Sequence, residues 1–245
     1  MKAMVQRLLA TVGYQLTPRV PRDFSPDDVA LVERVRPYTL TSAERIYSCV
    51  RAVEYLVANE IPGDLVECGV WKGGTVMAMA LTLLRLGDRN RQLYLFDTFE
   101  GMAPPTDADV DFRGASAAAQ LAESDKGPEG RVWAYATIER VQAAVLGTGI
   151  DPSMVHFVKG KVEDTLPAQA PDKIALLRLD TDWYESTRHE LVHLYPRLVS
   201  GGVIIVDDYG HWQGARRAVD EYLASERIPL LLNRIDYTGR IGVKR

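Results

Sequence analysis

Four aspartates close two apolar segments of the chain, and their side chains could bind a cation. The segment "LLRLDTD" ends in Asp180 and Asp182, and the segment "VIIVDD" ends in Asp207 and Asp208. Carboxylates that lie within a few ångströms of one another disfavour joint ionisation. A divalent cation would remove this conflict, and ligands that are all oxygen suit Mg²⁺, Mn²⁺ or Ca²⁺ rather than zinc. Asp182 has a simpler alternative role as the cap of the helix that follows it.

A second group of residues is typical of a site for a nucleoside-bearing ligand. The stretch "LVECGVWKGGTV" contains Glu67, Gly69 and Gly73 at a strand-to-helix turn, and Asp97 ends the next apolar segment. Glycines allow a sharp turn and close approach of a ligand, and a carboxylate at the end of the second strand can accept hydrogen bonds from ribose hydroxyls. Neither the dinucleotide fingerprint nor the P-loop is present. S-adenosylmethionine fits these features, and a purely structural turn is the alternative.

These residues require a sheet that brings strand ends together. Apolar segments alternate with helical patterns along the chain. Strands are expected at 64–70, 92–98, 154–160, 173–180 and 202–208, and helices at 74–86, 136–147, 185–199 and 214–226. This alternation predicts an α/β fold with a parallel sheet and helices on both faces. Ligands bind outside the carboxyl ends of such strands, so the aspartates should face one crevice.

Other segments flank this repeating unit. A short helix is expected at 26–35, and a longer helix should begin at a capping box formed by Thr41 and Glu44. Residues 100–135 are rich in Pro, Gly, Asp and Ala, which indicates an insertion or lid. Two short strands turning at Gly239 close the chain. We therefore expect a single domain over 1–245, with residues 1–60 as an N-terminal helical extension.

The composition excludes several classes of protein. The net charge of −4 argues against a nucleic-acid partner. Cys49 and Cys68 lack zinc-site spacing and are expected to be buried free thiols. No signal peptide is evident, and no run reaches the roughly 18 apolar residues of a membrane span. A cytoplasmic location without a membrane partner is expected.

The motifs together resemble a known family of enzymes. "LVECGVWKGGTV", "LYLFDTFEGM", "VKGKVEDTLP", "LLRLDTDWYEST" and "GGVIIVDDYGHWQGARRAVDEY" are similar to the macrocin O-methyltransferase family, which methylates sugar hydroxyls on macrolide and aminocoumarin antibiotics. The resemblance extends from about residue 37 to about residue 240. It implies a class I, Rossmann-like methyltransferase fold with a mostly parallel seven-stranded sheet, S-adenosylmethionine as methyl donor, and Mg²⁺.

The resemblance also implies roles for individual residues. Asp180, Asp207 and Asp208 would be the metal ligands, and Asp182 would be the general base. For the donor, the implied contacts are Glu67, Gly69 and Gly73 at the methionine end, Asp97 at the ribose, Lys161 and Val162 at the adenine, and Thr39 nearby. Many relatives have aromatic residues at the position of Lys161. His211 is a second candidate base, and its alternative role is that of a helix-entry residue.

Three functions agree with these features. The first is a Mg²⁺- and S-adenosylmethionine-dependent O-methyltransferase that acts on a deoxysugar of a glycosylated natural product, so that the partner is a small-molecule glycoside. The second is methylation of a catechol or other phenol, since the aspartate site suits oxygens of either kind. The third is a non-catalytic protein that retained the fold. A nucleotide-dependent dehydrogenase is a less well supported alternative, because the dinucleotide fingerprint is missing. A homodimer is expected from the relatives.

Overall fold

The computed structural model describes residue 11 and residues 20–124 and 133–245 of the chain. Within them lies a seven-stranded sheet in the order β3-β2-β1-β4-β5-β7-β6. The strands are β1 (Asp64–Cys68), β2 (Leu93–Asp97), β3 (Val155–Lys159), β4 (Ile174–Leu179), β5 (Leu198–Val206), β6 (Asn233–Arg234) and β7 (Arg240–Val243). Strands β1 to β5 pair in parallel, and β7 runs antiparallel to both β5 and β6. The prediction of a mostly parallel seven-stranded sheet is confirmed.

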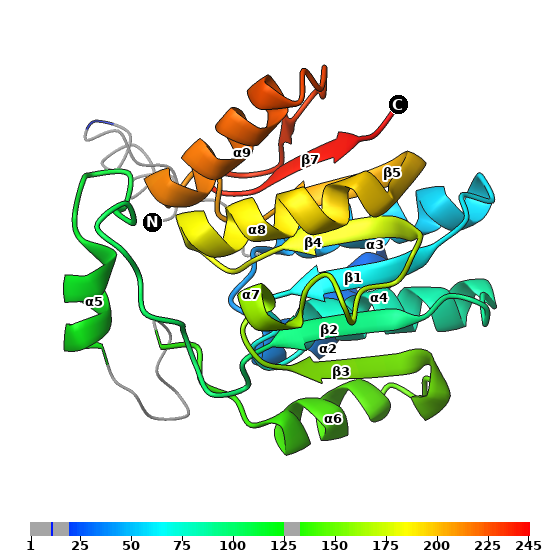
Figure 1. Cartoon of the computed structure of the whole chain (residues 1–245). Coiled ribbons are helices and arrows are strands. Elements are labelled where there is room, and N and C mark those ends of the chain that lie inside the picture. Colours follow the sequence, from blue (N-terminus) through cyan, green and yellow to red (C-terminus); the bar gives the residue numbers. More distant parts are fainter. Residues whose placement is uncertain (1–10, 12–19, 125–132) are drawn as a thin grey trace.

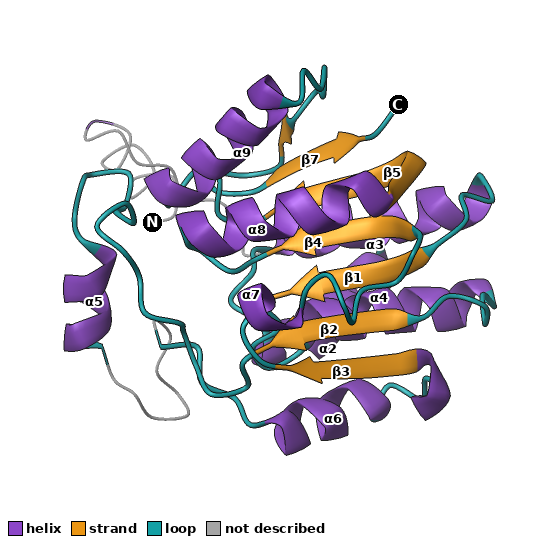
Figure 2. Ribbon diagram, in the orientation of Figure 1, coloured by secondary structure: helices purple, strands orange, loops and turns teal. Residues whose placement is uncertain are grey.

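Helices cover both faces of the sheet, as Figures 1 and 2 show. The helices of the described residues are α2 (Pro26–Val35), α3 (Ala43–Ala58), α4 (Gly74–Leu86), α5 (Ala117–Glu123), α6 (Ile138–Leu146), α7 (Val162–Thr165), α8 (Tyr184–Leu194) and α9 (Gln213–Ser225), with short 3₁₀ helices at Arg36–Tyr38, Pro152–Met154 and Tyr195–Arg197. Helices α2, α3, α4 and α6 pack on one face, and α7, α8 and α9 lie on the other. Each layer buries an apolar cluster against the sheet.

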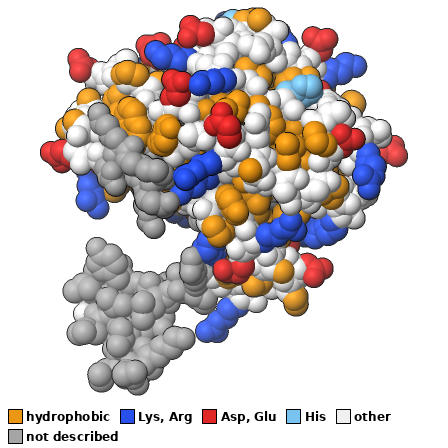
Figure 3. All heavy atoms as spheres, turned by 90° about the horizontal axis from the view of Figure 1, so that it is seen from below, with side chains coloured by type: hydrophobic (Ala, Val, Ile, Leu, Met, Phe, Trp, Pro, Cys, Tyr) orange, Lys and Arg blue, Asp and Glu red, His pale blue; other side chains and the backbone are white. Residues whose placement is uncertain are grey.

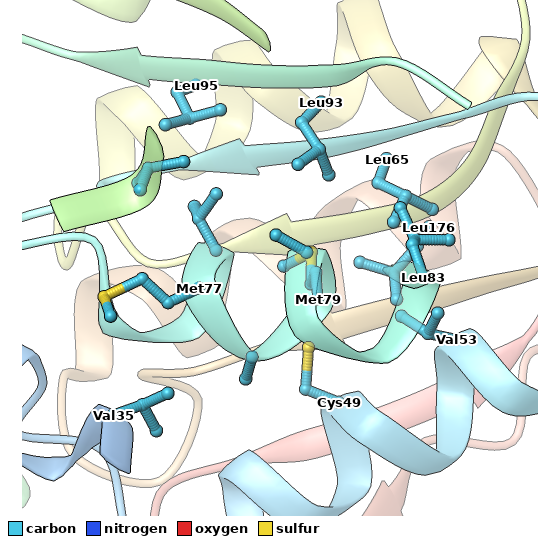
Figure 4. Close-up of a cluster of buried hydrophobic side chains, with 14 of the residues drawn as sticks. Val35, Cys49, Val53, Leu65, Met77, Met79, Leu83, Leu93, Leu95 and Leu176 are labelled. Carbon is cyan, nitrogen blue, oxygen red and sulfur yellow. The ribbon is translucent and has the colours of Figure 1, made fainter. Parts of the chain in front are cut away.

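The packing of the core explains why the sequences of the central strands are continuous apolar runs. All six residues of β4 are buried, as expected for a parallel strand covered on both faces. Figure 4 shows how Met77, Met79 and Leu83 of α4 pack among side chains of α3 and the sheet, including Cys49. Cys49 and Cys68 are both buried and free, as predicted.

Two predicted helix boundaries are wrong. The N-cap of α3 is Ser42 rather than Thr41, and the Ser42 hydroxyl accepts a hydrogen bond from the Arg45 amide at 3.2 Å. The helix predicted at 185–199 ends at Leu194 and continues as one 3₁₀ turn containing Pro196. Proline has no N–H to donate to a helix interior, so it marks this change. Strand β5 then begins at Leu198, before its predicted start.

The arrangement of the sheet determines where chemistry can occur. The carboxyl ends of the parallel strands lie along one edge, and the described part of the 100–135 insertion, including α5, stands opposite that edge (Figure 1). On the face shown in Figure 3, acidic and basic side chains are interspersed. In the described parts of the chain, no helix has the length and apolar character needed to cross a membrane. The division of the chain into one domain with an N-terminal extension remains a prediction.

Candidate active site

Three aspartates meet at the carboxyl ends of β4 and β5. Asp180 follows β4, and Asp207 and Asp208 follow β5. Each offers a carboxylate oxygen, and these oxygens all lie within 4.8 Å of one another. Asp182 lies beside them, and its backbone N–H donates to Asp208 Oδ2 at 3.2 Å. The structure thus brings together the four carboxylates whose convergence the strand-end rule predicts.

Two arginines that the sequence interpretation overlooked lie among these carboxylates. The Arg178 side chain is 1% exposed and contacts Glu67 Oε1 at 2.6 Å, Asp180 Oδ2 at 2.7 Å and Asp207 Oδ1 at 2.5 Å. Arg45, from α3, pairs with Asp207 Oδ2 and with Asp236. The charge conflict is therefore relieved in part by guanidinium groups. Position 178 carried a signal, because a charged residue stands inside an otherwise apolar strand.

The carboxyl groups still outnumber the guanidinium groups. Burial raises the pKa of Asp180 to about 7, and the neighbouring Asp207 and Asp182 add to this effect. Burial likewise raises the pKa of Asp182 to about 6 and that of Asp208 well above its ordinary value. These groups hold protons more readily than ordinary aspartates because their negative charges are crowded and poorly hydrated. A hard divalent cation fits this set of convergent carboxylate oxygens.

Asp182 faces the cavity and does not cap α8, so the simpler alternative for it is wrong. Its carboxylate Oδ1 accepts a 2.6 Å hydrogen bond from the indole N–H of Trp212. Its backbone adopts φ 68°, a left-handed conformation that is uncommon for residues other than glycine. The amide of Tyr184 at the start of α8 donates instead to Asp109 Oδ1, at 2.8 Å. The cap of α8 therefore comes from the insertion.

His211 lines the same cavity but engages aromatic neighbours. Its Nδ1 forms a hydrogen bond with the Tyr237 hydroxyl, and its ring packs edge-on against Trp212. Partial burial lowers the pKa of His211. The imidazole is thus held in place mainly by ring contacts and by a hydroxyl.

Two neighbouring cavities, which share lining residues, lie along the carboxyl ends of the strands. The larger, of about 420 Å³, contains the aspartate group, and the smaller, of about 70 Å³, lies toward β2 and β3. Both are lined by Gly69, Asp97, Gly101, Met102, Asp180 and Trp183. Of the residues predicted to bind the donor, Thr39 and Glu67 line the larger cavity, and Lys161 and Val162 line the smaller one. An elongated ligand could therefore span both.

Gly69 and Asp97, which border both cavities, also join neighbouring strands. A Cβ on Gly69, whose φ is +82°, would overlap the carbonyl oxygen of Asp180, so glycine is required for the close approach of the β1 turn to the end of β4. Asp97 accepts backbone hydrogen bonds from Val70 at 2.6 Å, Trp71 at 3.0 Å and Phe99 at 2.7 Å. A ribose would have to use the remaining acceptor capacity of that carboxylate.

Gly73 is not among the residues that line the two cavities, and its contact with the donor remains a prediction. It is the N-cap of α4 with φ 88°, and a Cβ there would contact Val145 and Val141 of α6. Its role is to turn the chain sharply enough for α4 to pack against α6.

The insertion is fastened to the loops that carry the aspartates. Asp109, which is 1% exposed, accepts hydrogen bonds from the Thr106 amide at 2.8 Å and hydroxyl at 2.9 Å as well as from Tyr184. Trp183 donates to the Ala103 carbonyl at 2.8 Å. A small apolar cluster around Trp183 and Trp212 joins the insertion to the starts of α8 and α9.

The Asp109→Ala substitution should lower the free energy of unfolding by about 2 kcal/mol, because it removes a helix cap and the buried acceptor of the hydrogen bonds from Thr106 and Tyr184. Urea unfolding of the variant beside the wild type measures this loss. Asp107→Ala is the matched control, because Asp107 is exposed in the same loop and should change stability little. Equal unfolding curves for the two variants would contradict the capping role.

The fold defines the class of this protein. A parallel sheet with an antiparallel β7, and a ligand cavity at the strand ends, is the arrangement of class I S-adenosylmethionine-dependent methyltransferases. TomG from Streptomyces achromogenes, an O-methyltransferase solved in complex with SAM, shares this fold, with a TM-score of 0.52, 10% identity and coverage of 99% of this chain and 98% of that chain.

The family follows from a sequence match over most of the chain. Residues 27–242 match the model of the macrocin O-methyltransferase (TylF) family, and the chain belongs to that family.

Its curated relatives act in antibiotic chemistry. The chain is 36% identical to the 8-demethyl-8-(2,3-dimethoxy-alpha-L-rhamnosyl)-tetracenomycin-C 4'-O-methyltransferase of Streptomyces olivaceus, over 96% of this chain and 89% of the relative. It is 33% identical to the demethyldecarbamoylnovobiocin O-methyltransferase of Streptomyces niveus, over 95% and 88%. The solved structure of the O-methyltransferase NovP matches with a TM-score of 0.73 and 30% identity, covering 100% of this chain and 99% of that chain.

Proposed function

We propose that this O-methyltransferase transfers a methyl group from S-adenosylmethionine to a hydroxyl on the deoxysugar of a glycosylated natural product, with Mg²⁺ bound at the site. The observation that carries the proposal is the convergence of Asp180, Asp207 and Asp208 beside a donor-sized cavity, with Asp182 next to them. The rhamnosyl acceptor in the name of the Streptomyces olivaceus relative supports a sugar hydroxyl as the methylated group.

The two cavities suit the two ends of the donor. We assign the adenine to the smaller cavity, near Lys161 and Val162, and the ribose to the edge of Asp97. The methionine end would reach Glu67, whose Oε2 is buried and has no hydrogen-bond partner among the described residues. A buried acceptor without a partner is costly, and an ammonium group of the donor would satisfy it.

The aspartate group would hold the metal. In this assignment Asp180, Asp207 and Asp208 are the ligands, and the bound Mg²⁺ would lower the pKa of the acceptor hydroxyl and fix its oxygen. Arg178 and Arg45 orient the carboxylate of Asp207 from the protein side.

The residues of the chain then perform proton transfer and alignment. Asp182 accepts the proton of the sugar hydroxyl while the oxygen attacks the methyl carbon of the sulfonium. The new O–C bond forms as the S–C bond breaks, giving a methyl ether and S-adenosylhomocysteine. General base catalysis of this kind typically contributes roughly 10²–10⁴-fold, and alignment of oxygen, methyl and sulfur supplies further rate. Trp212 holds the Asp182 carboxylate in place through its indole N–H. His211, the second candidate base, contacts Tyr237, Phe112 and Trp212.

The direct test is a methyl-transfer assay over a panel of glycosides and catechols, with and without a chelator. We expect methylation of a glycoside, loss of at least tenfold in rate with EDTA, and recovery on adding excess Mg²⁺, since the metal would activate the hydroxyl. If only catechols are methylated, the acceptor is a phenol and the proposed sugar acceptor is wrong. Full activity after removal of divalent ions would refute the metal role, and a lack of donor binding would favour a non-catalytic protein.

We also propose a cytoplasmic homodimer that acts on small molecules rather than on nucleic acids. The support is the acidic net charge and the family membership. Light scattering coupled to size-exclusion chromatography would test the dimer.

A further inference from the structure

Three aromatic side chains form a half-exposed cluster beside the aspartate cavity, and the proposed reaction does not use it. Phe112 comes from the insertion, His211 from the loop after β5, and Tyr237 from the turn between β6 and β7. The ring centroids are 5.7 Å apart for Phe112 and His211, 5.6 Å for Phe112 and Tyr237, and 5.8 Å for His211 and Tyr237. Phe112 is 48% exposed and Tyr237 is 47% exposed. Large aromatic side chains that gather at a surface often mark a binding site.

A groove continues from Phe112 and His211 of this cluster. It has a volume of about 610 Å³ and lies between residues 107–112 of the insertion and the start of α9. Phe112, Tyr209 and Arg216 line it, together with His211 and Trp212. His211 and Trp212 also line the cavity that contains the aspartates. The groove therefore begins at the wall of the proposed reaction site.

The groove is formed by paired backbone rather than by a chance gap between loops. The Gln213 amide donates to the Val110 carbonyl at 2.9 Å, and the Gln213 side-chain Nε2 donates to the Asp111 carbonyl at 2.9 Å. Asp111 and Trp212 also form a β-bridge. These bonds hold the insertion against α9 in the described structure.

The size of the inner cavity indicates what the groove could hold. A volume of about 420 Å³ must take the methionine and ribose parts of the donor together with the acceptor sugar. Binding cavities for drug-sized ligands range over about 300–1,000 Å³. Once the donor and the sugar occupy the inner cavity, no room is left in it for a multi-ring aglycone. The groove offers the nearest space, its aromatic rings suit a flat ring system, and Arg216 with Asp107 suits polar substituents.

We propose that this groove is the aglycone subsite and that Phe112 and His211, which line it, recognise a planar, oxygen-bearing aromatic aglycone. Tyr237 packs against both rings and supports them. This inference rests on the proposed function, because it assumes a glycoside acceptor whose sugar lies at the aspartates. The Phe112 ring contributes packing area to the aglycone, and the His211 ring separates the sugar from it.

The test compares two acceptors that differ only in the aglycone: methyl α-L-rhamnoside and a hydroxyanthraquinone α-L-rhamnoside. The measured quantity is the ratio of kcat/KM for the aryl rhamnoside to that for the methyl rhamnoside. We expect this ratio to exceed 1 in the wild type and to fall about tenfold in Phe112→Ala, as loss of one aromatic contact implies. Phe112→Tyr keeps a ring and should restore most of the ratio.

Leu231→Ala is the control, because Leu231 is 82% exposed and distant in the chain from the groove, on the segment before β6. Circular dichroism and S-adenosylhomocysteine binding should be the same for all variants. If both rhamnosides are methylated and Phe112→Ala leaves the ratio unchanged, the subsite is refuted while the proposed function stands. If catechols are methylated and no rhamnoside is, the proposed function fails and the aglycone subsite fails with it.

Discussion

Asp182→Asn should lower kcat by about 10²–10⁴-fold, the range typical for loss of a general base, while S-adenosylhomocysteine still binds with wild-type affinity. The amide cannot accept the proton of the sugar hydroxyl, so the oxygen would have to attack without that assistance. The donor cavity is otherwise unchanged, because the donor is assigned to residues of β1, β2 and the loop after β3. Single-turnover methyl transfer and calorimetric titration with S-adenosylhomocysteine measure the two quantities.

Asparagine is the appropriate replacement for structural reasons. Asp182 has φ 68°, and asparagine tolerates this left-handed conformation better than other residues that have a Cβ. The amide oxygen can still accept the hydrogen bond from Trp212 Nε1, and the amide nitrogen can donate to Asp208. Asp182→Ala would lose both contacts and would confuse a chemical effect with a conformational one.

Asp172→Asn provides the control, because Asp172 is an exposed aspartate in the loop before β4. It should retain wild-type kcat. If Asp182→Asn loses less than threefold in kcat, the base lies elsewhere, and His211 becomes the first residue to examine. If its affinity for S-adenosylhomocysteine also falls sharply, Asp182 has a structural role in the donor site.

The general rules that predicted the sheet from the sequence also predicted much of the site. Alternating apolar and helical segments indicated a parallel sheet, and the carboxyl ends of parallel strands meet at one edge. Those two steps suffice to bring Asp180 near Asp207 and Asp208 without any contact being known. The sequence also placed Glu67 and Asp97 on successive strands, and the structure shows that these two strands pair directly, in register from Leu65 with Leu93 onward.

What escaped prediction depends on contacts between residues far apart in the chain. Arg45 reaches Asp207 across 162 positions, and the insertion residue Asp109 caps a helix 75 positions later. Local sequence patterns do not predict contacts between residues so far apart in the chain. Asp97 illustrates a related difficulty, because the sequence cannot show that three backbone N–H groups already occupy its carboxylate. The charge conflict was foreseen, but its partial relief by Arg178 and Arg45 required the folded structure.

Arg178→Met should lower the free energy of unfolding by about 3–5 kcal/mol, the usual cost of removing one partner from a buried ion pair. Arg178 is the charged group that contacts Glu67, Asp180 and Asp207 together, and its side chain is almost fully buried. Methionine has a similar length and is apolar, so packing around the strand is largely kept. The loss then reflects Glu67 and Asp180, which lose their ion-pair partner in a poorly hydrated site, while Asp207 keeps Arg45. Urea unfolding in EDTA measures it without a contribution from bound metal.

Two further measurements separate this electrostatic effect from a general weakening of β4. Arg85→Met removes a partly exposed arginine that pairs with Glu54, and it should cost at most about 1 kcal/mol. Adding Mg²⁺ should recover more stability in Arg178→Met than in the wild type, because the unpaired carboxylates would bind the cation more strongly and binding to the folded state stabilises it. A loss below 1 kcal/mol in EDTA would show that the carboxylates are protonated in the variant. Protonation would then remove the charge repulsion among the crowded aspartates, and neither the arginine nor a metal would be needed to stabilise the site.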